Sequence, residues 1–132
     1  QADNVLNLPE GSYVALLSHS GSRGLGAAIA KHYSLLAREV CKLPREAQHF
    51  AWLSLDSEEG QEYWMSMNLA GDYARACHER IHLNLSKALG LKPVANVNNH
   101  HNFAWKEEIA PGRMPVSFST LRHTTPAAPC SR

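Results

Sequence analysis

Apolar positions along the chain predict two helices of unequal length. In the first segment they recur, with one histidine among them, at steps of three or four residues before Pro44, a spacing typical of an amphipathic helix: Leu25, Ile29, His32, Leu36 and Val40. In the second segment the same spacing extends over residues 58–89: Tyr63, Met67, Ala70, Ala74, Cys77, Ile81, Leu85 and Ala88. Ser57 before this segment and Gly90 after it are typical of helix boundaries. We therefore expect one shorter helix and one long helix.

Short apolar stretches predict strands beside these helices. Residues 12–18 (SYVALLS) have the length and composition of a strand, and residues 94–105 (VANVNNHHNFAW) alternate loosely between polar and apolar. Residues 50–55 form a short apolar patch that could make a further brief strand. The expected fold class is α+β, with short strands packed with the long and the shorter helix. Residues 109–132 carry Pro, Ser, Thr and Ala without periodicity, which predicts an irregular tail.

Length and composition favour one folded domain that does not enter a membrane. The chain has 132 residues, of which 44% are hydrophobic, so we expect a single core. A formal net charge of +1 means that any contact with nucleic acid must be local. The three cysteines show no C-x-x-C spacing, which argues against a disulfide framework and favours a reducing compartment. Without an apolar run of transmembrane length or a signal-like start, the sequence predicts a cytoplasmic location.

The segment HSGSRGLG, residues 19–26, lies between the first predicted strand and the first predicted helix. It combines three glycines, two serine hydroxyls, a histidine and an arginine. Glycines let backbone N–H groups converge, and an arginine can hold two phosphate oxygens at once, so the segment could bind an anion. His19 could serve there as a metal ligand or as an acid or base. The alternative is a tight structural turn in which Ser22 caps the helix and Arg23 is a surface residue.

Two further groups of histidines are candidates for chemistry. Residues 96–103 (NVNNHHNF) place His100 and His101 next to each other, and in an extended chain only one of them can face a given site. The alternative is a loop whose amides satisfy the backbone. On the long predicted helix, His78, Glu79 and His82 spell H-E-x-x-H, the motif of zinc proteases. The longer form of that motif is absent, so we interpret these histidines as residues of the helix flank.

Three segments in this order, HSGSRGLG, LDSEEGQEYWMSMNLAGDYA and NHHNFAWKEE, resemble the RtcB family of RNA ligases. That family joins an RNA 3′-phosphate or 2′,3′-cyclic phosphate end to a 5′-hydroxyl in tRNA splicing or RNA repair. It uses GTP and manganese through a guanylylated histidine. The resemblance implies that His19 and His101 bind manganese. It also implies that Arg23 holds the RNA terminal phosphate, with Ser22 and Asn102 beside it.

The same resemblance divides the chain and bears on its activity. Residues 1–108 correspond to a central segment of the RtcB fold, whereas residues 109–132 show no likeness to the family. No residue of the chain matches the guanylylated histidine, and several metal ligands are also unmatched. The sequence therefore predicts a truncated RtcB-like protein that is inactive alone, binds manganese weakly or not at all, and contacts RNA ends. We expect a homo-oligomer or complementing ligase segments as partners. The alternative is a small structural or interaction protein that has kept the fold and lost catalysis.

Overall fold

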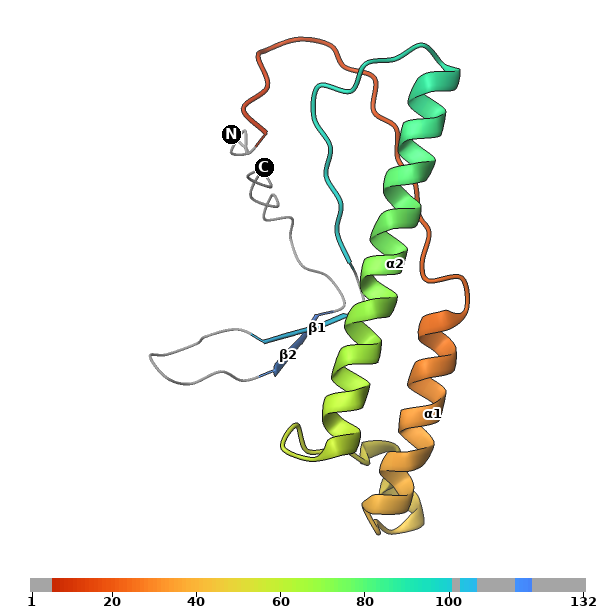
Figure 1. The fold of residues 1–132 in the computed structure, drawn as a ribbon. Coiled ribbons are helices and arrows are strands. Elements are labelled where there is room, and N and C mark those ends of the chain that lie inside the picture. The colour runs from red at the N-terminus through yellow and green to blue at the C-terminus, as the bar shows by residue number, and fades with distance from the viewer. Residues whose placement is uncertain (1–5, 101–102, 107–115, 120–132) are drawn as a thin grey trace. The chain divides into compact units, whose positions relative to one another are not determined.

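The computed structural model describes residues 6–100, 103–106 and 116–119 (Figure 1). Its elements in chain order are α1 (Leu25–Val40), the 3₁₀ helix η1 (Arg45–Phe50), α2 (Glu58–Ala88), β1 (Phe103–Lys106) and β2 (Val116–Ser119). The chain divides into two compact units, one formed by Ser18–Ile81 and the other by Gln1–Leu17 with His82–Arg132. The described part is mostly helical, so the expected α+β class, with strands packed with helices, holds only in its helical component.

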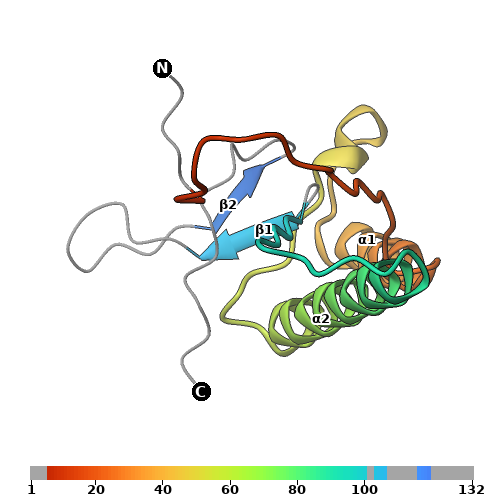
Figure 2. The same ribbon diagram turned by 90° about the horizontal axis from the view of Figure 1, so that it is seen from above.

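The unit Ser18–Ile81 is built on an antiparallel pair of helices. Helix α1 and the first part of α2 lie side by side in both views (Figures 1 and 2). The rings of Tyr33 and Tyr63, one from each helix, have centroids 5.0 Å apart. The most buried side chains of this unit are small ones, Ala37, Ala70 and Ala74, with exposed fractions of 4%, 5% and 7%. The core of this pair is therefore thin and rich in alanine.

Both ends of α2 confirm the boundaries that the sequence predicts. At the start, the Ser57 hydroxyl accepts a hydrogen bond from the Gly60 N–H at 3.1 Å, as an N-cap residue does. At the end, Gly90 takes a left-handed φ of 65°. Its N–H donates to the Lys87 carbonyl at 3.2 Å, while the next N–H, that of Leu91, donates to the Ser86 carbonyl at 2.8 Å. This pair of bonds is a Schellman motif, which satisfies the last carbonyls of a helix.

The expected strands differ most from the structure. Residues 12–18 form no strand, and Val14 and Leu17 are 80% and 97% exposed. A strand forms by exchanging hydrogen bonds with a neighbour, and no described strand lies beside this segment to pair with it. The patch at residues 50–55 is also not a strand, because the chain there leaves η1 and continues irregularly to α2.

The strands that do form are short and pair with each other. In β1, Phe103 pairs with Ser119 and Lys106 with Val116 of β2 in an antiparallel register. Ala104 in β1 is 2% exposed. The strand expected over residues 94–105 is thus confined to its last residues, since 94–100 are not in a strand. β2 lies within residues 109–132, where the sequence predicts an irregular tail. The expected boundary at residue 108, between the RtcB-like segment and this tail, stays a prediction.

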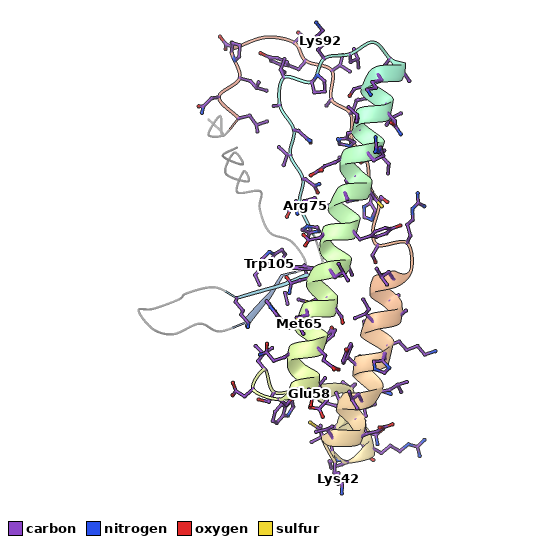
Figure 3. The ribbon with its side chains drawn as sticks, in the orientation of Figure 1. Lys42, Glu58, Met65, Arg75, Lys92 and Trp105 are labelled. Carbon is purple, nitrogen blue, oxygen red and sulfur yellow. The ribbon has the colours of Figure 1, made fainter. Side chains whose placement is uncertain are left out.

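Many large apolar side chains of the described residues are exposed. In the unit Ser18–Ile81 they include Phe50, Trp52, Met65 and Leu69, each at least 62% exposed. Further along α2 from Met65, the Arg75 guanidinium contacts the Asp72 carboxylate at 3.0 Å (Figure 3 labels Met65 and Arg75). That ion pair is largely exposed and adds little stability. Among the described helices, none has the length and apolar content needed to cross a membrane.

Candidate phosphate-binding turn

The segment of residues 19–26 forms a tight turn that starts α1. The Ser22 hydroxyl accepts a hydrogen bond from the Gly26 N–H at 2.7 Å, and the Ser22 carbonyl accepts one from the Leu25 N–H at 3.1 Å. The N-cap residue of α1 is Gly24, which has no side chain, and the Ser22 hydroxyl satisfies an N–H of the first helical turn from two residues further upstream. This hydrogen bond uses a lone pair of the hydroxyl oxygen, and the hydroxyl proton can still be donated to another group.

Two successive residues of this turn have left-handed backbone conformations. Gly24 has φ 90° and Arg23 has φ 54°. Glycine takes this conformation freely, whereas a residue with a Cβ does so uncommonly, at a cost of order 1 kcal/mol. Arg23 is exposed, so the turn holds its side chain toward solvent instead of packing it. Non-glycine residues held in sparsely populated conformations are found preferentially at functional sites.

Helix α2 supplies polar groups beside Arg23. A hydrogen bond with the Cys77 side chain raises the pKa of the Tyr73 hydroxyl, while the positive charge of Arg23 acts in the opposite direction. Tyr73 is 46% exposed, so this corner of the unit combines a cation and a phenol that are both open to solvent.

A histidine of α2 connects this helix to the turn. The His78 Nε2 lies 2.8 Å from the Ser20 carbonyl oxygen, a contact between residues 58 positions apart in the chain. Since a carbonyl oxygen only accepts hydrogen bonds, Nε2 carries the proton and donates it. Sequence reasoning assigned His78 to the helix flank and missed this contact. The sequence feature that could have indicated it is the position of His78 directly after Cys77, at the edge of the apolar face of the helix.

The residues that the resemblance selects for metal binding are only partly described. His19 is exposed and belongs to the turn. His101 and Asn102 lie outside the described residues, so their positions are untested. The neighbouring His100 stacks on Phe103, with ring centroids 5.2 Å apart. Within residues 6–100, 103–106 and 116–119, no group of three His, Cys, Asp or Glu side chains could hold a metal ion. The described residues alone therefore do not provide a complete set of metal ligands.

The turn thus combines glycines, a helix start and an exposed arginine whose backbone is in a left-handed conformation. Comparison with known proteins identifies its family. The model of the family described as tRNA-splicing ligase RtcB matches residues 1–118. The chain belongs to the RtcB family.

Alignments with individual relatives cover less of the chain than the family model does. The chain is 35% identical over 80 residues to the tRNA-splicing ligase RtcB of Pyrococcus abyssi, an alignment that covers 58% of this chain and 9% of the relative. It is 34% identical over 71 residues to the same protein of Pyrococcus horikoshii, covering 52% of this chain and 8% of the relative. The aligned part thus spans under a tenth of these relatives. No solved structure matches the chain significantly.

Proposed function

We propose that this chain carries an RNA-end-binding part of an RtcB-type ligase, with the turn at residues 19–26 as its phosphate site. Arg23 holds the terminal phosphate, because its planar guanidinium can donate two parallel hydrogen bonds to phosphate oxygens. The Ser22 hydroxyl and the Asn102 amide are further donors to the same group. The observation that carries the proposal is the left-handed backbone conformation of Arg23, whose side chain is exposed to solvent. Arg23 lies between Gly21 and Gly24 in the turn.

Manganese has a secondary place in this proposal. In the family it supplies positive charge that neutralises phosphate, and imidazoles are suitable ligands for it. His19 and His101 are the residues of this chain that would hold the ion. Two imidazoles are fewer than the three protein ligands of a usual catalytic site, so we expect weak binding that a phosphate co-ligand strengthens.

The isolated chain is proposed to lack ligase activity and to work in an assembly, either with copies of itself or with complementing ligase segments. The exposed large apolar side chains of the unit Ser18–Ile81 support this, since association would bury them. The same observation also favours the alternative of an interaction protein without catalysis. Binding of phosphate ends distinguishes the two functions, because only the first requires it.

Arg23→Gln is expected to weaken binding of inorganic phosphate at least about tenfold, because hydrogen bonds between a guanidinium and an anion contribute about 1.5–3 kcal/mol. Calorimetric titration measures this. A short RNA with a 3′-phosphate should also bind more tightly than the same RNA with a 3′-hydroxyl. Arg80→Gln, an exposed arginine on α2, is the matched control and should leave both affinities unchanged. Equal binding by wild type and Arg23→Gln would contradict the proposed site.

His19→Ala is expected to weaken manganese binding by at least about tenfold when phosphate is present, because it removes one of the two proposed imidazole ligands. The paramagnetic broadening of histidine ring signals by Mn²⁺ measures this in solution. His82→Ala is the control from the H-E-x-x-H motif and should leave manganese binding unchanged. The reverse order of effects would assign the metal to α2 instead of the turn.

A further inference from the structure

The hydrogen bond between His78 and Ser20 bears on the turn's backbone donors. The two ends of a trans peptide unit point in opposite directions, so the carbonyl of one residue and the N–H of the next are antiparallel. The Ser20 carbonyl accepts the His78 Nε2–H at 2.8 Å. The N–H of Gly21 is therefore directed away from His78 and from the surface of α2 that carries it.

The space around Gly21 is open. A Cβ built on Gly21 would meet no other atom within 4 Å, in contrast to Gly26, where it would lie 2.7 Å from the Ser22 hydroxyl oxygen. Because Gly21 is also exposed, its N–H, two residues before Arg23, is suited to donate to the same anion as the guanidinium. Rotation of the Ser20–Gly21 peptide unit would instead present a carbonyl oxygen, which repels phosphate.

We infer that His78 is a positioning residue for phosphate binding: by holding the Ser20 carbonyl, it fixes the Gly21 N–H as a donor to the phosphate that Arg23 binds. This inference rests on the proposed function of the turn. Loss of the His78 imidazole would remove the hydrogen bond that holds the Ser20–Gly21 peptide unit in this orientation. Glycine at position 21 makes rotation of that unit easy. His78 itself does not touch the anion.

The test uses the full chain, inorganic phosphate as the probe, and variants that keep or remove the donor. His78→Leu is expected to lower phosphate affinity about tenfold, as loss of one hydrogen bond to a charged group does. His78→Gln retains an N–H donor and should keep the phosphate affinity within about threefold of wild type, because its amide can still make a weaker hydrogen bond to the Ser20 carbonyl. His82→Leu, one helical turn further along α2, is the matched control and should bind phosphate normally.

A spectroscopic readout separates positioning from stability. Phosphate should shift the Gly21 amide signal in wild type and in His78→Gln, but not in His78→Leu, while thermal melting shows that the variants are folded. If His78→Leu binds phosphate as wild type does and Arg23→Gln does not, the inference about His78 is wrong and the proposed site stands. If Arg23→Gln also binds as wild type does, or wild type itself does not bind, the proposed site is wrong and the inference fails with it.

Discussion

Gly60→Ala is expected to lower the free energy of unfolding by about 2–3 kcal/mol, at the upper end of the usual range for overpacking. Gly60 is buried in the first turn of α2, and a Cβ there would overlap the backbone carbonyl oxygen of Ser54. A backbone atom cannot move aside as a flexible side chain does. The segment that contains Ser54 must therefore shift away from the helix.

That shift would also break the cap of α2. The Ser57 hydroxyl donates to the Ser54 carbonyl at 2.9 Å and accepts from the Gly60 N–H at 3.1 Å, so one side chain connects both backbone groups. The higher helix propensity of alanine returns at most about 1 kcal/mol. Urea denaturation followed by far-ultraviolet circular dichroism measures the net effect.

Gly21→Ala is the matched control for this substitution. Its added Cβ has open space and its φ is not in the left-handed region, so stability should change by no more than about 0.5 kcal/mol. Equal stability of Gly60→Ala and wild type would show that the segment before α2 adapts to the methyl group. The close approach at Ser54 would then not constrain the fold.

No covalent guanylate is expected on the isolated 132-residue chain after incubation with labelled GTP and manganese. The resemblance to the family implies that guanylate is carried by a histidine that no residue of this chain matches. A positioned nucleophile is required for covalent catalysis, and the histidines among the described residues belong to the turn, the helices and the segment before β1. The measurement is intact mass after denaturation, which detects a single added guanylate.

A complete RtcB ligase, treated in the same way, is the positive control for this experiment. A guanylate adduct on any histidine of the isolated chain would overturn the proposal that it is inactive alone. Phosphate binding by Arg23 and the absence of guanylylation are independent outcomes. The first tests the proposed phosphate site, and the second tests whether the isolated chain can react with GTP without a second chain.

The helices could be predicted from the sequence because their signals are local. The step of three or four residues in α2 places Ala70 and Ala74 on one face, and both are buried. The Ser57 cap and the Gly90 stop are contained within a few residues of the chain. Periodicity was less accurate for α1, where it selected His32 and Val40, although Tyr33 and Ala37 are the more buried residues. Packing against a neighbouring helix decided which flank faces inward.

The two helices, their boundaries, the glycine turn and membership of the RtcB family could all be inferred from the amino-acid sequence. Each of these depends on residues that are close in the chain or on ordered motifs. The absence of a strand at residues 12–18 could not be inferred in this way, because strand formation depends on a partner elsewhere in the chain. The same holds for the contact between His78 and Ser20, whose residues are 58 positions apart and meet only when α2 packs beside the turn.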